Sequence, residues 1–455
     1  MLDINIIKYA EKFNVDHVEV RYQYLERDAI ILRDENLIDF VHGVDEGVSI
    51  RVLIDGCWGF AYTCNPTKDE IEETIRRAIK LSRVQGGRGI VKLAEADIAK
   101  GSFQFDFKID PRNIDLKDKL SILVKGVENA REIAKENLKS IEINYFDLFF
   151  KTQFLSSDGG DAIQSGVRFY FSFGVYGETQ NGLFYDSERY GAISGLEKLE
   201  ESIIDVSSRM AKRVLNQSKA QKPQTGPIKA ILESRAAGDF FHEMGHSFEA
   251  DSVIRRTSAF EGLKNQKIAV ENLTVYEDPT IPNAWGSIFF DDEGVKPRRI
   301  ILIENGVLKG YIHSRETAYR LNEAPTGHAR AESFMYEPIV RMGNLIVKSG
   351  DWSEEELIRE TREGIYIAGA RGGQTTGKGP FQFQASEAFI IKNGELTTPL
   401  RSIGVSMNIL EALKGIEAIC DKAQYYITLC GKGDQRMSVT AYAPTIKIDK
   451  VIIGG

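Results

Sequence analysis

The feature that most constrains this chain is the pentapeptide His242-Glu-Met-Gly-His246. Residues four apart lie one above the other on an α-helix, so two imidazoles at this spacing can bind one metal ion if the segment is helical. Glu243 lies beside that face, where its carboxylate can accept a proton from a water that attacks a carbonyl group. The chain has only six histidines. We therefore predict a metal-binding helix, in preference to two ordinary histidines beside a surface glutamate.

The surrounding residues predict a helix with two different faces. One face is apolar, and its side chains recur at helical spacing: Phe241, Met244 and Phe248. The other face is polar and is predicted to line a cavity: His242, His246 and Glu249. Gly245 weakens the prediction slightly, because glycine destabilises a helix by about 1 kcal/mol relative to alanine.

A hydrolytic zinc site needs a third protein ligand and an open position. The extended pattern with a histidine six residues after His246 is excluded, because that residue is Ser252. Several other residues could supply the ligand: Glu249, Asp251, Glu261, Glu271 and Cys430. Cys430 precedes Gly431 and Lys432, and a nearby lysine favours the thiolate, although a cysteine of this kind is more often simply buried. Glu249 and Asp251 could instead orient the ligand imidazoles or lie at a solvated helix end, so the residues alone leave the choice open.

The first half of the chain has the pattern of an α/β domain. Strands are predicted within residues 18–64, where Gly43, Gly47, Gly56 and Gly59 separate them, and again at 141–154 and 167–175. Helices are predicted after the Thr67/Glu70 capping box, at 116–137 and at 196–214, with an Asn181-Gly182 turn between the later elements. The polar, proline-bearing segment 216–227 predicts a boundary between domains at 1–218 and 219–455, since 455 residues rarely share one core.

The second half is predicted to be β-rich. Asn305-Gly306 and Asn393-Gly394 each separate two apolar runs, which is a strong hairpin signal. Helices are predicted from Ser353, with a capping box to Glu356, and at 407–418. The glycine-rich segment 371–379 lacks the spacing of a phosphate-binding loop and is predicted to be a mobile loop near a groove. The fold class is therefore an antiparallel α/β domain followed by a β-rich, barrel-like domain that carries the metal-binding helix.

Composition limits the function classes. A net charge of −8 argues against a surface for direct nucleic-acid binding, which needs clustered Lys and Arg. Four cysteines in 455 residues are too few for a disulfide framework. Neither a signal peptide nor a membrane span is evident in the sequence. These observations predict a cytoplasmic protein.

Several segments resemble the TldD/PmbA family of metalloproteases: 242–251, 306–315, 326–330, 338–344, 364–366 and 430–435. The resemblance covers essentially the whole chain and is strongest from residue 228 onward. It implies that His242, His246 and Cys430 hold the metal and that Glu243 is the base. Because the related TldE/PmbA proteins lack the metal motif, it also implies the catalytic type. The chain departs from the family's usual H-E-x-x-x-H in having one residue fewer between Glu243 and His246, which fits a regular helix better.

The resemblance also bears on partners and activity. It implies a dimer, either with itself or with a TldE/PmbA-like partner, that encloses the site. His328 lies in segment 326–330 and is predicted to line the substrate groove or stabilise an oxyanion, unless it is an ordinary loop histidine. Together with the residues above, the family resemblance predicts a zinc-dependent peptidase that hydrolyses short or unfolded peptides in an enclosed cleft. The alternative is a non-catalytic regulatory protein of the gyrase-modulator type, with a structural zinc.

Overall fold

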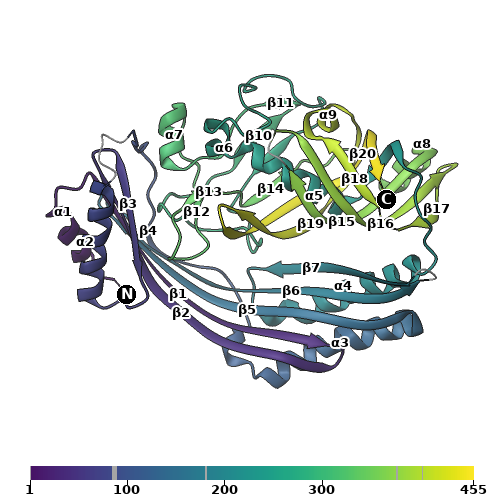
Figure 1. The fold of residues 1–455 in the computed structure, drawn as a ribbon, viewed down its shortest axis with the longest axis horizontal. Coiled ribbons are helices and arrows are strands. Elements are labelled where there is room, and N and C mark those ends of the chain that lie inside the picture. The colour runs from purple at the N-terminus through teal and green to yellow at the C-terminus, as the bar shows by residue number, and fades with distance from the viewer. Residues whose placement is uncertain (1, 85–89, 180–181, 376–377, 402, 455) are drawn as a thin grey trace.

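A computed structural model describes residues 2–84, 90–179, 182–375, 378–401 and 403–454. Its first half is built on one long, curved, mainly antiparallel sheet (Figure 1). The strands are β1 (His17–Arg33), β2 (Asn36–Ile54), β3 (Cys57–Thr63), β4 (Lys100–Gln104), β5 (Leu138–Ser156), β6 (Asp161–Thr179) and β7 (Gly182–Ala192). Their order is β3-β2-β1-β5-β6, and both β4 and β7 pair with β6. Asn181 of the predicted Asn181-Gly182 turn lies outside the described residues.

The strands are longer than the sequence predicted, because three of the four glycines do not interrupt them. Gly59 lies within strand β3. Strand β2 runs through Gly43 and Gly47. A Cβ atom on Gly47 would lie 2.2 Å from the ring of Phe334, so this glycine allows the second half of the chain to approach the sheet closely. Gly56, by contrast, has a positive φ of 74° and lies in the turn between β2 and β3, as predicted.

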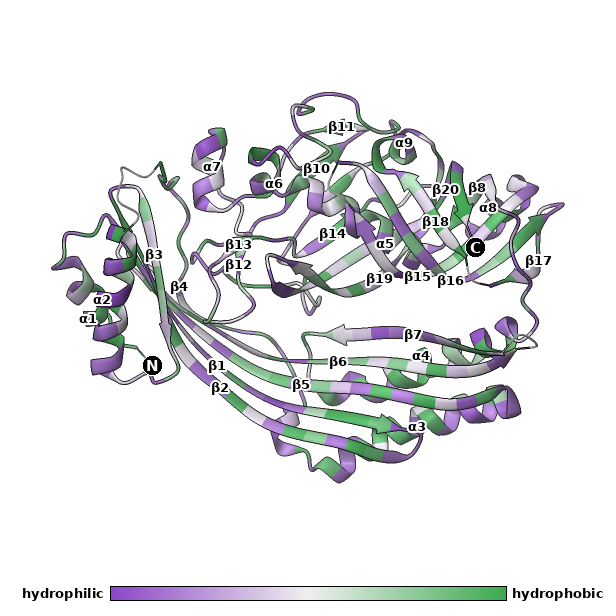
Figure 2. Ribbon diagram, in the orientation of Figure 1, coloured by the Kyte–Doolittle hydropathy of each residue, from purple (hydrophilic) through white to green (hydrophobic). Residues whose placement is uncertain are grey.

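Four helices cover this sheet or its end: α1 (Asn5–Glu11), α2 (Lys68–Val84), α3 (Leu116–Ala134) and α4 (Leu199–Gln217). Helices α3 and α4 pack on the face that points away from the second half of the chain (Figure 1). Polar and apolar residues alternate along β1, β2 and β5 (Figure 2), so one set of side chains can face these helices. Helices α3 and α4 confirm the helices predicted at 116–137 and 196–214, although the last turn of the first is a 3₁₀ segment (Lys135–Asn137).

The second half contains a closed β-barrel, as predicted. Its ring is formed by β8 (Gly226–Leu232), β15 (Glu363–Thr375), β16 (Pro380–Lys392), β18 (Gly404–Asn408) and β20 (Gln435–Gly454). It closes because β8 pairs in parallel with β15 and antiparallel with β20. The remaining strands are β9 (Val275–Glu277), β10 (Ile300–Glu304), β11 (Val307–Leu308), β12 (Ala329–Arg330), β13 (Ile339–Val340), β14 (Asn344–Val347), β17 (Glu395–Leu400) and β19 (Ile416–Lys432).

Local turn and capping signals predicted this half well. Both hairpins are present, and Asn305, Gly306, Asn393 and Gly394 all have the positive φ that such turns require. Helix α8 (Glu354–Thr361) begins with the predicted reciprocal capping box. The other helices are α5 (Ser234–Gly245), α6 (Ala250–Ile254), α7 (Arg315–Leu321) and α9 (Ile409–Lys414).

Two predictions for this half are only partly correct. The helix predicted at 407–418 spans only α9, because Asn408 caps its start and strand β19 begins at Ile416. The segment 371–379 is not a loop over its first part, since residues up to Thr375 belong to β15 and pair with β16. Positions 376–377 lie outside the described residues. Short apolar or glycine-rich runs do not distinguish helix, strand and loop by periodicity alone.

The two halves are joined by buried ion pairs. Arg21 on β1 lies 2.7 Å from a carboxylate oxygen of Asp292 and donates hydrogen bonds to the carbonyl oxygens of Ser333 and Tyr336. Arg51 on β2 pairs with Glu293 at 2.7 Å. We propose that the domain boundary lies between α4 and β8, at residues 218/219. In the part of the chain that is described, no helix is both long and apolar enough to cross a membrane.

Candidate metal centre

Helix α5 places the pentapeptide in the core of the second half of the chain. Its first turn is capped by Glu233, whose side chain accepts a hydrogen bond from the backbone N–H of Arg235. Helical backbone angles continue through His246, so the rings of His242 and His246 lie on one side with their centroids 5.4 Å apart. The predicted apolar stripe is confirmed, since Phe241, Met244 and Phe248 are fully buried.

Gly245 is explained by a close contact. A Cβ atom on this residue would lie 2.1 Å from the sulfur of Met342, which packs against the helix. The helix therefore carries glycine where a neighbouring side chain approaches its backbone.

Cys430 comes to this helix from strand β19. Its Sγ lies 3.2 Å from Nε2 of His246, a residue 184 positions away in the sequence. The ligand atoms of His242, His246 and Cys430 all lie within 4.8 Å of one another. In the described part of the chain, this is the one group of three His, Cys, Asp or Glu side chains close enough to share an ion. Two imidazoles and a thiolate are donors that suit zinc.

The other candidates for the third ligand have different partners. Glu249 is fully buried, and its Oε2 lies 3.0 Å from Nδ1 of His246. Asp251 pairs with Lys432 at 2.8 Å and with Arg255 at 2.7 Å. Glu261 and Glu271 form surface ion pairs with Arg256 and Lys267, respectively. None of these four carboxylates belongs to the group of three described above.

The contact with Glu249 orients His246. Because the Nδ1 side of the ring faces a carboxylate, its Nε2 side is turned toward Cys430. Lys432 lies 3.0 Å from the same carboxylate oxygen. Burial raises the pKa of Glu249, but Lys432 and His246 outweigh it and lower this pKa to about 2. Glu249 is thus an anion fixed behind the imidazole.

The charges of the three clustered side chains favour a thiolate. Burial disfavours it, but the positive charges of His246 and His242 hold the pKa of Cys430 well below its ordinary value. Burial likewise opposes a charge on His246, whereas Glu249 and Cys430 raise its pKa well above the usual value. A thiolate is the form of cysteine that binds metals.

Glu243 lies beside these residues without joining them. Its Oε1 is 3.9 Å from Nε2 of His242, and its side chain is 13% exposed, so it is accessible from the adjacent cavity. Burial raises the pKa of Glu243, although His242 and His246 partly oppose the shift. A carboxylate with a raised pKa is better matched to proton transfer near neutral pH.

The cavity beside Glu243 has a volume of about 970 Å³ and lies between the two halves of the chain. Strand β7 and helix α4 supply one wall, and α5, β15 and β19 supply the other. His328 is not among the described residues that line it. Instead, His328 is fully buried, with its Nδ1 2.9 Å from the carbonyl oxygen of Thr326 and its Nε2 3.4 Å from Glu277. The structure therefore gives no support to a groove or oxyanion role for His328.

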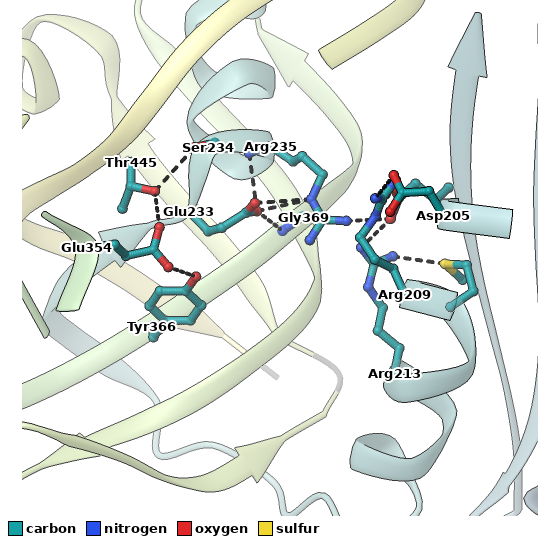
Figure 3. Close-up of polar contacts among 12 residues, drawn as sticks. Asp205, Arg209, Arg213, Glu233, Ser234, Arg235, Glu354, Tyr366, Gly369 and Thr445 are labelled. Atoms are coloured by element: carbon teal, nitrogen blue, oxygen red, sulfur yellow. Dashed lines mark hydrogen bonds and ion pairs between the residues drawn. The ribbon is translucent and has the colours of Figure 1, made fainter. Parts of the chain in front are cut away.

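The cavity wall contains polar residues that the sequence did not indicate. Glu188 on β7 pairs with three arginines: Arg209, Arg213 and Arg235. Figure 3 shows Arg235 of α5 extending toward Arg209 and Arg213 of α4. This network ties the first turn of helix α5 to the first half of the chain. It could not be found from sequence, because Glu188 and Arg235 are 47 residues apart and belong to different halves of the chain.

Two further residues that the sequence did not indicate are Asp239, one helical turn before Glu243, and Tyr426 on β19. The hydroxyl of Tyr426 donates a hydrogen bond of 2.7 Å to Oδ1 of Asp239. Burial raises the pKa of Asp239, while Tyr426, His242 and Arg189 oppose that shift. Helical spacing could have indicated Asp239, which precedes Glu243 by four residues.

Family models match most of this chain. Models of the PmbA/TldA metallopeptidase domain 1, central domain and C-terminal domain match residues 18–82, 109–221 and 225–455, respectively. The matched domains are thus those of a metallopeptidase family. The chain belongs to the PmbA/TldD family.

The similarity to named relatives extends over nearly the full length of this chain and of each relative. A metalloprotease of Methanocaldococcus jannaschii is 36% identical, over 96% of this chain and 97% of its own length. A zinc metalloprotease TldD homolog of Saccharolobus solfataricus is 32% identical, over 99% of each chain. Relatives with TldD names support the TldD type predicted from the motifs.

Solved structures share the fold. TldE from Thermococcus kodakarensis superposes with a TM-score of 0.84 at 21% identity, over 99% of each chain. A Thermotoga maritima protein, described as a candidate modulator of a DNA gyrase, has a TM-score of 0.83 at 20% identity, over 99% of this chain and 98% of its own. At these identities the likeness concerns the fold alone.

Proposed function

We propose that this protein is a zinc-dependent peptidase in which His242, His246 and Cys430 hold the ion and Glu243 is the base. The observation that carries the proposal is the convergence of these three donors beside Glu243, at the wall of a cleft. A zinc ion held there supplies Lewis acidity toward the substrate carbonyl and the attacking water. Three protein ligands also leave a position open, whereas a structural zinc site usually has four.

Glu243 and the cleft supply the remaining steps. Glu243 accepts the proton of the water that attacks the peptide carbonyl and delivers it to the leaving amine nitrogen. Residues 424–432 of β19 line the cavity, and among the described strands β19 pairs with β20 alone. Its free edge can therefore bind an extended peptide through backbone hydrogen bonds. A cleft of about 970 Å³ accommodates a short or unfolded segment rather than a folded domain.

Metal removal tests this function. Wild-type protein is expected to contain about one zinc per chain and to hydrolyse unstructured peptides. A chelator should abolish hydrolysis, and added zinc should restore it, with metal measured by mass spectrometry and cleavage by chromatography. Bound zinc without hydrolysis of any peptide in a diverse set would favour the alternative, a regulatory protein of the gyrase-modulator type with a structural zinc.

We also propose that the chain forms a dimer with a second copy or with a TldE/PmbA-like protein. Residues 36–46 of β2 pair with β1 alone among the described strands, and they expose several apolar side chains: Leu37, Ile38, Phe40, Val41 and Val44. An exposed apolar edge strand is an association surface. The relationship in fold to TldE supports a partner of the same family.

Light scattering tests the dimer. The chain is expected at twice its monomer mass, and Ile38→Asp with Val44→Asp should shift it toward the monomer. Leu183→Asp, which changes an exposed leucine on β7, is the matched control and should not. A chain that is monomeric alone but pairs with a relative lacking the metal motif would establish the heterodimer. A wild-type monomer that pairs with neither would contradict the proposal.

The cell location and the ligand class complete the proposal. Four cysteines in 455 residues support a cytoplasmic location, where thiols stay reduced. The net charge of −8 supports a peptide rather than a nucleic acid as the bound polymer.

A further inference from the structure

Arg189 lies in the wall of the cavity opposite the metal-binding helix. It is an exposed residue of β7, and it lines the same cavity as Glu243. A Cβ atom on Gly191, two residues later, would lie 3.1 Å from both Ile427 and Trp285 in the second half of the chain. Alternate residues of a strand point to the same face, so the side chain of Arg189 also points toward that half.

Arg189 differs from the other cations of the cavity in having no partner. Seven lysine or arginine side chains line the described wall, and six of them pair with carboxylates. These six are Arg209, Arg213 and Arg235 with Glu188, Arg255 with Asp251, Arg371 with Asp186, and Lys432 with Glu249. Within the described residues, the side chain of Arg189 forms no hydrogen bond or ion pair, whereas its backbone belongs to the ladder between β6 and β7. Its guanidinium, with five N–H donors, is available to a ligand.

Arg189 also faces residues that lie next to Glu243 in the cavity wall. It lies near enough to Asp239 and Tyr426 to influence both electrostatically. No ion pair within 4.0 Å joins it to Asp239, whose Oδ1 accepts the hydrogen bond of the Tyr426 hydroxyl and whose buried Oδ2 has no hydrogen-bond partner among the described residues. Asp239 precedes Glu243 by four residues, which is about 6 Å along a helix. An extended peptide advances about 3.3 Å per residue, so this separation corresponds to about two residues of substrate.

We propose that Arg189 is a specificity-determining residue that binds a carboxylate of the peptide substrate, one or two residues from the bond that is cut. Arginine binds carboxylates through paired N–H donors, so a free carboxylate satisfies the cation that the protein leaves unpaired. The carboxylate is either the C-terminal group of the peptide or an acidic side chain. This inference rests on the proposed peptidase function and adds the substrate class to it.

Three peptides that differ only at the C-terminal residue or its terminal group test the proposal and distinguish the two sources. They are a free acid, its C-terminal amide, and an amide with glutamate as the last residue. Zinc-loaded wild type is expected to show kcat/KM at least about 10-fold higher for one of the two carboxylate peptides than for the plain amide. A preference for the free acid identifies the C-terminal carboxylate, and a preference for the glutamate peptide identifies a side chain.

Variants attribute the preference to Arg189. Arg189→Gln should bring the ratio close to one, and Arg189→Lys should retain part of it. Arg255→Gln removes a cavity arginine that is already paired with Asp251 and should keep the wild-type ratio. Equal rates on all three peptides, or a preference that survives Arg189→Gln, would overturn the proposal.

Measurements of peptide binding test this inference separately from the proposed peptidase function. Calorimetry on Glu243→Ala, with and without Arg189→Gln, measures the affinity for the same three peptides without turnover. If wild type cleaves none of them but the carboxylate preference in binding depends on Arg189, then the peptidase function fails and the carboxylate site stands. If binding shows no such preference, the carboxylate site fails whatever the activity.

Discussion

Glu243→Ala is expected to lower the kcat of peptide hydrolysis by about 10²- to 10⁴-fold while the protein keeps its zinc. The carboxylate is the acid–base group of the proposed reaction, and water alone would have to replace it. Its oxygen atoms are not part of the group formed by His242, His246 and Cys430, so the ion should remain bound. Activity on an unstructured peptide and zinc content by mass spectrometry, measured on the same preparation, check both halves of this prediction.

A matched control separates the role of Glu243 from a general effect of charge. Glu271→Ala also removes a carboxylate, but from a side chain that is 85% exposed and paired with Lys267. This variant should retain wild-type activity and zinc. Turnover of Glu243→Ala within a few-fold of wild type would rule out its role as the base. Loss of zinc from Glu243→Ala would instead mean that this residue supports the metal site.

Features that depend on neighbouring residues could be predicted from the sequence. The spacing of His242 and His246 and the apolar stripe at Phe241 predicted helix α5 because helical contacts join residues three and four apart. The two Asn-Gly hairpins and the Ser353 cap were predicted for the same reason, since each is decided within four residues. Alternating polarity predicted the strands of the first half, although it did not give their full length.

Features that depend on distant residues could not be predicted in this way. The residues alone left the third ligand open, and only the family resemblance pointed to Cys430. The folded chain brings Cys430 on β19 to a helix 184 residues earlier. Glycines such as Gly47 indicated breaks, whereas the structure shows that Gly47 makes room for the Phe334 ring. The partners of Glu188 belong to both halves of the chain, so they can be identified only from the folded structure.

The metal-binding role proposed for Cys430 predicts a large effect on zinc content. Cys430→Ala should lower zinc affinity by more than about 100-fold, since loss of a ligand exceeds the 10- to 100-fold loss that follows removal of a group hydrogen-bonded to one. The variant removes the thiolate and leaves two imidazoles, which is too few for the three-ligand site. Zinc per chain after purification, together with circular dichroism to show that the fold is retained, measures this effect.

Cys420→Ala is the control for Cys430→Ala, because Cys420 is a buried thiol on the same strand that lies outside the group of three. It should keep about one zinc per chain. If Cys430→Ala also kept its zinc, the third ligand would have to be another side chain near His246. Glu249 would then be the first candidate, since its carboxylate already lies 3.0 Å from that imidazole. Loss of zinc from Cys430→Ala alone would assign the thiolate to the ion and leave Glu249 as the group that orients His246, held in turn by Lys432.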